Sequence, residues 1–172
     1  MTWAGGSSSG ATRRGNAYKE ALRADLEADP RVDSVVDVGV GSGEDTDYPH
    51  VGVAAGQLVA AGEADRALLV CGTGIGVAMA AGTVPGVRAS VAHDSYSVER
   101  LVKSNNAQVL TLGHRVIGLE LARALVSGWL DHRFDESSAS ASKVAALADY
   151  QLAGGRPART LGAPATTAAT FH

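Results

Sequence analysis

The sequence predicts an α/β protein built on a doubly wound sheet of about five parallel strands, with helices on both faces. Two observations lead to this fold class. Short apolar runs alternate along the chain with longer, alanine-rich stretches of helical period. Aromatic residues make up only 5% of the 172 residues. The core must therefore be built from Val, Leu, Ile and Ala, which is common where helices pack closely on a parallel sheet.

Each expected strand is short and apolar throughout, as a strand covered by helices on both faces should be. Four such runs occur at residues 35–38, 67–71, 88–92 and 108–112, and a weaker first strand is expected at residues 2–5. The alternation with helical segments favours parallel strands joined by crossover helices.

Six helices are expected between and after the strands, at residues 16–28, 49–61, 76–82, 95–104, 118–130 and 138–152. The second of them carries signals at both ends. Asp47 precedes Tyr48 and Pro49, so a capping carboxylate and an early proline are expected to open it. Gly62 follows its last apolar residues and is expected to end it. Asp94 precedes the fourth helix in the same way.

Composition favours one domain, at residues 1–152, followed by a flexible tail at 153–172 that is rich in Gly, Pro, Ala and Thr. With 15 basic and 18 acidic residues, the chain lacks the basic excess of a nucleic-acid binder. A single cysteine, Cys71, excludes an intramolecular disulfide and a cysteine-cluster metal site. No apolar run is long enough to span a membrane and no secretion signal follows Met1, so we expect a cytoplasmic protein without membrane or nucleic-acid partners.

The most specific stretch, LLVCGTGIGVAMAA, covers residues 68–81. An apolar strand runs into Cys71, and Gly72, Gly74 and Gly76 then lead into a helix of small residues. Amide groups clustered at a helix N-terminus attract anions, although the spacing differs from that of dinucleotide-binding loops. A thiol at this position suits proton transfer or nucleophilic attack. An inert, buried cysteine fits the local pattern equally well.

Several motifs in one order resemble the ribose-5-phosphate isomerase B and galactose-6-phosphate isomerase family between residues 18 and 147. They are VVDVG, DTDYPH, CGTGIG, VPGVRASVAHDSYS and SNNAQVLTLGHRVIG. The resemblance implies a Rossmann-like sheet of five parallel strands and conversion of a phosphorylated aldose to its ketose through a cis-enediolate, with no metal or organic cofactor. It also implies a homodimer, sometimes paired into a tetramer, whose active sites lie at the subunit interface.

The same resemblance assigns roles around the glycine loop. Cys71 is the expected base that moves the proton between C1 and C2 of the sugar phosphate. The amides from Gly72 to Gly76 are expected to stabilise the enediolate oxygen, and Thr73 to bond a substrate hydroxyl. Ile75 occupies the position at which some family members carry a glutamate base, which leaves Cys71 for that role.

Further substrate contacts are implied outside the loop, each beside a plainer structural alternative. Asp47 and Tyr48 match a motif near the sugar, and Asp47 is equally a helix cap. Asn105 matches an anchor for sugar hydroxyls and is otherwise a turn residue. Arg115 matches an arginine that binds phosphate in the neighbouring subunit's site. The structural alternative is that it forms an ion pair on the surface. The adjacent pair His93 and Asp94 is interpreted as structural.

Several departures from the family pattern leave the substrate open. Ser7 and Ser8 replace an Asp-His pair, with Ser8 left as the substrate contact, and Ser104 replaces the histidine assigned to ring opening. Lys143 alone remains where two arginines bind phosphate. Arg13 and Arg14, in a lengthened first loop, either restore the missing charge or form a solvated basic pair.

Three hypotheses follow. The first is an aldose-ketose isomerase for a short sugar phosphate such as a tetrose, which needs no ring opening. The second is an ordinary ribose 5-phosphate isomerase with rearranged contacts. The third is a non-catalytic sugar-phosphate-binding or partner subunit, which the retained Cys71 and its glycine loop argue against.

Overall fold

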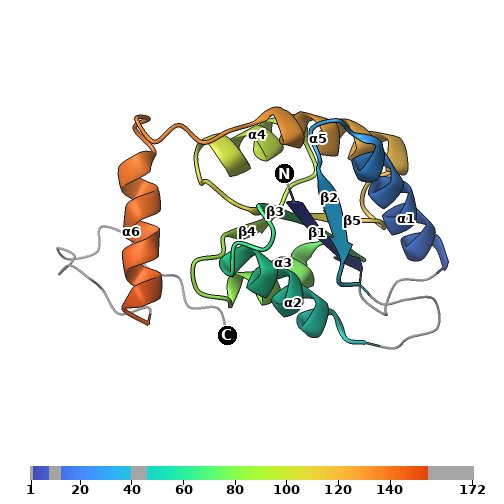
Figure 1. Cartoon of the computed structure of the whole chain (residues 1–172), viewed down its shortest axis with the longest axis horizontal. Coiled ribbons are helices and arrows are strands. Elements are labelled where there is room, and N and C mark those ends of the chain that lie inside the picture. Colours follow the sequence, from blue (N-terminus) through green and yellow to red (C-terminus); the bar gives the residue numbers. More distant parts are fainter. Residues whose placement is uncertain (1, 8–12, 40–45, 155–172) are drawn as a thin grey trace, which may run out of the picture.

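Five parallel strands form the central sheet, in the order β2-β1-β3-β5-β4 (Figure 1). The computed structural model describes residues 2–7, 13–39 and 46–154. The strands are β1 (Thr2–Ser7), β2 (Ser34–Asp37), β3 (Arg66–Cys71), β4 (Ala89–Val91) and β5 (Val109–Gly113). The helices are α1 (Arg13–Ala28), α2 (Tyr48–Ala60), α3 (Ile75–Gly82), α4 (Ser95–Lys103), α5 (Leu119–Asp131) and α6 (Ala141–Leu152).

This strand order confirms a parallel α/β sheet and fixes where a ligand is expected. The chain leaves β1 toward one edge of the sheet to form β2, and then returns past β1 to form β3 and the other half. In such sheets the crevice lies outside the carboxyl ends of the two strands at which the direction reverses. Here those strands are β1 and β3, and β3 ends at Cys71.

The predicted elements are all present, with small differences at their ends. The weak strand expected at residues 2–5 is β1, and α1 begins three residues earlier than expected, at Arg13. Arg13 and Arg14 therefore belong to the first turn of α1 and not to a lengthened loop. Helix α6 begins at Ala141 because residues 137–140 form turns. Most of the tail expected at 153–172 lies outside the described residues.

Alternate residues of β3 enter two separate cores. Leu68 and Val70 belong to the larger cluster with α1, α4 and α5, which includes the fully buried Trp129. Leu69 and Cys71 belong to the cluster with α2 and α3. The period-two alternation of a strand thus places the thiol on the α2 and α3 side of the sheet.

Helices α2 and α3 approach closely because α2 presents glycine to its neighbour. A Cβ atom on Gly52 would lie 2.7 Å from Ala80 Cβ, and one on Gly56 would lie 2.9 Å from Val84 Cγ2. The alanine-rich character of α3, IGVAMAAG, serves the same contact. The scarcity of aromatic residues in the chain therefore has a packing reason on this face of the sheet.

Helix α2 ends as expected but begins without the expected capping bond. Gly62 follows its C-terminus with φ of +73°, which confirms the predicted stop because glycine adopts this backbone region without a Cβ clash. Asp47 occupies the N-cap position, but its side chain makes no capping hydrogen bond. Pro49 lacks one of the amides that a cap would bind, and the amide of His50 donates to the backbone oxygen of Asp47 instead.

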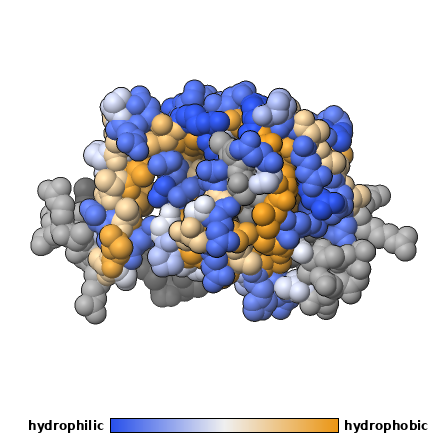
Figure 2. All heavy atoms as spheres, viewed as in Figure 1, coloured by the Kyte–Doolittle hydropathy of each residue, from blue (hydrophilic) through white to orange (hydrophobic). Residues whose placement is uncertain are grey.

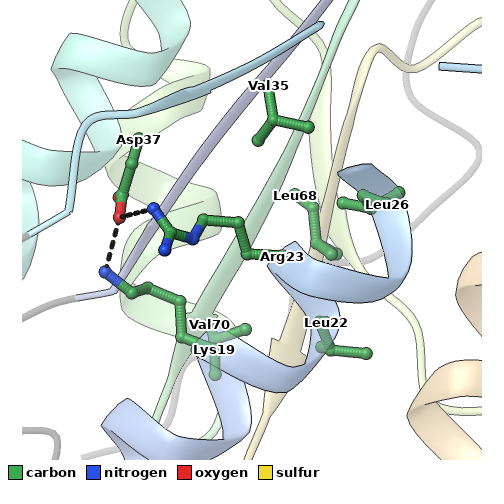
Figure 3. A pocket seen from close by; sticks show the side chains of 8 residues that line it. All are labelled: Lys19, Leu22, Arg23, Leu26, Val35, Asp37, Leu68 and Val70. Atoms are coloured by element: carbon green, nitrogen blue, oxygen red, sulfur yellow. Dashed lines mark hydrogen bonds and ion pairs between the residues drawn. The ribbon is translucent and has the colours of Figure 1, made fainter. Parts of the chain in front are cut away.

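Among the residues whose burial the structure describes, three polar side chains are buried, and each has a partner. Lys19 of α1 donates to Asp37 Oδ2 at the end of β2 over 2.8 Å, above a cavity of about 20 Å³ lined with aliphatic side chains (Figure 3). Arg66 donates to the carbonyl oxygen of Trp129 over 2.6 Å, and burial lowers the pKa of this guanidinium to about 10. The third, Thr111, lies at the candidate site.

Helix α6 stands apart from the sheet, beyond the edge strand β4 (Figure 1). Val144 is its one buried residue, whereas Leu152 is 86% exposed. Figure 2 shows apolar side chains of this helix open to view on the left of the molecule. Within the described part of the chain, no helix has the length and apolar character needed to cross a membrane.

His93 and Asp94 join β4 to α4 and have structural roles, as predicted. The backbone amide of Gly113 donates to His93 Nε2 over 2.9 Å, which links the carboxyl ends of β4 and β5. Asp94 caps α4 by accepting the amide of Ser97 over 2.8 Å. Because Nε2 accepts a hydrogen bond, the ring must be neutral in the folded protein, and burial lowers the pKa of His93 from its ordinary value of 6.5.

Acidification should therefore weaken the fold through His93. A lowered folded pKa means that the unfolded chain takes up the proton first, so stability is complete above about pH 6.5 and declines as pH falls below it. His93→Gln keeps an acceptor for the Gly113 amide but does not titrate. Urea unfolding between pH 7.5 and 5.5 should show a smaller loss for this variant than for wild type, since His114 and His132 titrate in both. Equal losses would contradict the prediction.

Candidate functional site

Cys71 ends a strand in which all six residues are buried. Its side chain is 8% exposed, and the backbone amide of Gly74 donates to its Sγ atom over 3.0 Å. The loop that follows turns back so that the amide of Gly74, just before α3, reaches the sulfur.

Two glycines are required by the close approach of this loop to β5. Gly74 has φ of +84°, and a Cβ atom on it would lie 3.1 Å from the backbone carbonyl carbon of Leu112 in β5 and 2.8 Å from Val91 Cγ2 in β4. A Cβ atom on Gly113, the last residue of β5, would lie 2.7 Å from backbone atoms of Thr73. Side chains at either position would push the loop away from the sheet and displace the amides that face the thiol.

Thr111 of β5 holds the loop in place through a hydrogen bond. The sequence analysis did not identify this residue as part of the site. Its Oγ1 donates to the carbonyl oxygen of Gly74 over 2.7 Å, and the residue is fully buried. Gly74 is thereby held at both polar groups, with its amide on Cys71 and its carbonyl on Thr111. The available signal was a lone hydroxyl within the otherwise apolar strand VLTLG, because a buried hydroxyl requires a partner.

The rim of the loop presents exposed side chains. Thr73 is exposed, and its Oγ1 accepts a long hydrogen bond of 3.4 Å from the amide of Ile75. Tyr48 lies against Gly76 so closely that a Cβ atom there would be 2.8 Å from its ring. Asp47 is exposed and free of a capping bond. The structure thus brings Asp47, Tyr48 and Thr73 to the same edge of the sheet as the thiol.

Arg115 lies over the loop of its own chain. Its amide donates to the carbonyl oxygen of Gly72 over 3.1 Å, and the preceding amide, of His114, donates to that of Cys71 over 3.0 Å. The Arg115 side chain passes Gly72, with Cδ and Nε 3.6 Å from the site of a Cβ atom on that glycine. The Arg115 side chain therefore lies beside Gly72, the residue that follows the thiol in the same chain, and its expected role in a neighbouring subunit's site stays a prediction.

Two predicted residues lie elsewhere. Asn105 follows the C-terminus of α4, whose nine residues separate it by about 14 Å from the edge at which Cys71 lies. Its Nδ2 donates to the carbonyl oxygen of Arg100 over 3.0 Å. Lys143 is exposed on α6, one helical turn before Leu147. Ser8 lies outside the described residues.

Charged and titratable groups near the thiol do not form a metal site. The described residues contain no group of three or more His, Cys, Asp or Glu side chains that could hold a metal ion. His114, next to Arg115, is half-buried, and burial followed by repulsion from Arg115 lowers its pKa. The site as described offers a thiol, amide donors, one guanidinium and neutral hydroxyls, a set that suits an anionic substrate and proton transfer.

Comparisons with known proteins agree with this chemistry. A family model described as Ribose/Galactose Isomerase matches residues 9–147. D-erythrulose-4-phosphate isomerase 2 of Mycolicibacterium smegmatis is 64% identical over 83% of this chain and 94% of the relative. D-erythrulose-4-phosphate isomerase of Pectobacterium atrosepticum is 46% identical over 64% and 72%, respectively. Ribose-5-phosphate isomerase B of Escherichia coli is 43% identical over 59% and 68%.

Solved structures show the same fold. Ribose-5-phosphate isomerase B of Clostridium thermocellum superimposes with a TM-score of 0.80 at 34% identity, over 90% of this chain and 99% of that one. The type B ribose 5-phosphate isomerase of Trypanosoma cruzi gives 0.82 at 27% identity, over 90% and 98%. Since the family model covers most of the sequence and the relatives match over most of their length, the chain belongs to the ribose/galactose isomerase family.

Proposed function

We propose that this protein interconverts the aldose and ketose forms of a four-carbon sugar phosphate, D-erythrose 4-phosphate and D-erythrulose 4-phosphate. The observation that carries the reaction type is the Cys71 thiol held under the amide of Gly74 at the carboxyl edge of the sheet. The substrate class is supported by two relatives named D-erythrulose-4-phosphate isomerases, at 64% and 46% identity.

The proposed mechanism uses Cys71 as the base. Its thiolate removes the proton from C2 of the aldose, and the electron pair of that C–H bond forms the C1=C2 double bond while the C1 oxygen becomes negative. The same thiol then delivers the proton to C1, and the proton of the C2 hydroxyl passes to the C1 oxygen, which leaves the C2 ketone. The amides from Gly72 to Gly76 face the developing oxyanion, and preorganised donors act most strongly where charge develops.

The surrounding side chains would hold the substrate. Thr73 presents an exposed hydroxyl, and the Asp47 carboxylate is free to bind sugar hydroxyls because it does not cap α2. Tyr48 forms a wall over the first turn of α3. Arg115 supplies a cation within the same chain. A binding-only protein would not need the thiol between the amide of Gly74 and the end of β3, so this arrangement favours an enzyme over a non-catalytic subunit.

We further propose that two copies of the chain share each site. Asn105 and Lys143 would meet a thiol only if they were supplied by a second copy, because α4 separates Asn105 from the thiol of its own chain. Lys143 shares a helix face with Leu147, which lines a groove between α6, β4 and α4 together with Asn105. The edge strand β4 is open on one side, and Met79 beside it is 71% exposed. Apolar exposure of this kind is typical of an interface.

The base assignment predicts the behaviour of Cys71→Ala. Isomerisation of erythrose 4-phosphate should fall at least about a thousandfold, since the variant lacks the thiol that the Gly74 amide contacts. The fold should remain, because the substitution is small and removes only one heavy atom, the buried sulfur. Wild-type turnover in deuterium oxide should place deuterium on the substrate carbon, detected by NMR. Turnover of the variant at the wild-type rate would remove Cys71 from the mechanism.

The shared site predicts complementation between two defective variants. Cys71→Ala and Asn105→Ala should each be impaired alone, whereas a heterodimer contains one site with both defects and one site with neither. After subunit exchange in an equal mixture, about a quarter of the wild-type activity should return, since half of the dimers are mixed and half of their sites are intact. Mixing without recovery, despite exchange shown by mass spectrometry, would contradict the shared site.

The absent ring-opening histidine predicts the substrate preference. Ser104 is half-buried and carries no titrating group, so a furanose must open without help, whereas a tetrose 4-phosphate has its ring oxygen blocked and stays open. The kcat/KM for erythrose 4-phosphate should exceed that for ribose 5-phosphate by at least about tenfold, or roughly 1.4 kcal/mol.

Ser104→His should raise the ribose reaction more than the erythrose reaction, because only ribose has a ring to open. Ser137→His, on the exposed loop before α6, is the matched control and should change neither. A wild-type preference for ribose 5-phosphate would support the pentose hypothesis, and an equal gain on both substrates would contradict the ring-opening argument.

A further inference from the structure

A groove of about 580 Å³ runs along the open edge of β4, between α4 and α6. Its polar lining consists of two arginines, Arg88 and Arg100, with Ser90, Ser97 and Asn105. No aspartate or glutamate lines it among the residues that the structure describes. A groove that presents two guanidinium groups and neutral donors, without a carboxylate, is chemically suited to an anion.

Arg88 is a cation with only neutral partners. Its Nε donates to the carbonyl oxygen of Asn106 over 2.8 Å, and a longer contact of 3.5 Å joins NH1 to the carbonyl oxygen of Gly86. In the described part of the chain, no carboxylate lies within ion-pair distance of it. Burial lowers the pKa of this guanidinium. A bound anion would offset that cost of desolvation, as a buried charge generally requires.

Arg100 is held in place on the opposite wall. Its guanidinium lies 5.8 Å from the ring centre of Tyr96 and 2.6 Å from Glu99 Oε1. Its NH1 reaches Ser104 Oγ over 3.4 Å, and its Nε is buried with no hydrogen-bond partner. Glu99 is shared with Lys103, 3.1 Å away, so the local charge of the three residues is +1. The cation is therefore oriented by its neighbours without being neutralised.

We propose that Arg88 and Arg100 bind the phosphate group of the substrate in the site that this groove completes in the second copy. The inference rests on the proposed function and names the residues that take over phosphate binding. The Asn105 side-chain amide donates to the backbone carbonyl oxygen of Arg100, and both residues line the groove. A hydroxyl-binding group and a phosphate-binding group therefore belong to one surface, which suits a substrate that carries both hydroxyls and a phosphate.

Arg100→Gln tests the proposal. It removes the positive charge and the planar set of guanidinium N–H donors while keeping a long polar side chain. The matched control is Arg123→Gln on α5. The Arg100 and Arg123 side chains are both 39% exposed, but Arg123 pairs with Asp25 and Glu120 away from the groove. Two measurements are needed: the Kd of inorganic phosphate by calorimetry, and kinetics with erythrose 4-phosphate beside unphosphorylated erythrose.

The expected result is a phosphate Kd and a KM for erythrose 4-phosphate that both rise at least about tenfold in Arg100→Gln, with little change in Arg123→Gln. The kcat/KM for unphosphorylated erythrose should stay unchanged, which a structural role for Arg100 would not produce. Glu99→Gln should tighten phosphate binding, because it releases the guanidinium from its carboxylate. Arg100→Lys should rescue the effect only in part, since an ammonium lacks the planar fork.

Three results would overturn the proposal. They are unchanged phosphate affinity in Arg100→Gln, an equal loss on phosphorylated and unphosphorylated erythrose, or weaker phosphate binding with an unchanged KM for the sugar phosphate. The last would mark an anion site separate from the substrate. The calorimetric comparison does not depend on turnover, so an absence of isomerase activity in wild type would count against the proposed function and leave this test intact.

Discussion

The residue on which the candidate site depends is Gly74, which is held by hydrogen bonds at both of its backbone polar groups. Its amide donates to Cys71 Sγ and its carbonyl accepts from Thr111 Oγ1. The loop can lie this close to β5 only because Gly74 and Gly113 lack side chains. The position of the thiol, the direction of the surrounding amides and the start of α3 are therefore coupled. A change at any one of these residues would move the donors that face the proposed enediolate.

The second determinant is the separation of site residues across the sheet. Parallel strands bring Cys71, Thr73 and Arg115 to one edge, whereas the antiparallel course of α4 carries Asn105 to the other. Helix α6 carries Lys143 away from the sheet altogether (Figure 1). A chain that splits its proposed substrate contacts in this way has a chemical reason to assemble with a second copy. The open edge of β4 and the exposed apolar side chains near it give the assembly a physical basis.

Positive charge is divided between the thiol and the groove. Arg88 and Arg100 line the groove beside Asn105. Around the thiol the charge is sparse, with Arg115 as the cation that contacts the glycine loop. If the groove holds the phosphate, the anion would be bound away from the base, which keeps the negative charge of the substrate from opposing a thiolate.

Much of the fold followed from the sequence alone, because its signals are local. Apolar runs, helical periodicity, Gly62 after α2 and Asp94 before α4 report on nearest neighbours along the chain, and the structure places elements at each of them within a few residues. The stretch from Cys71 to Gly76 was likewise recognisable, since glycines at alternate positions after an apolar strand specify a tight turn and exposed amides.

Only the tertiary structure showed the features that depend on contacts between distant strands. Thr111 became visible as the support of Gly74 once β5 lay beside β3, and Asp47 lost its expected capping bond because Pro49 lacks the amide that the carboxylate would bind. The placement of Arg115 over its own Gly72, and of Arg88 and Arg100 in one groove, was also decided there. Sequence spacing carries no information about which side chains from separate elements meet at an edge, and that meeting is set by strand order and packing.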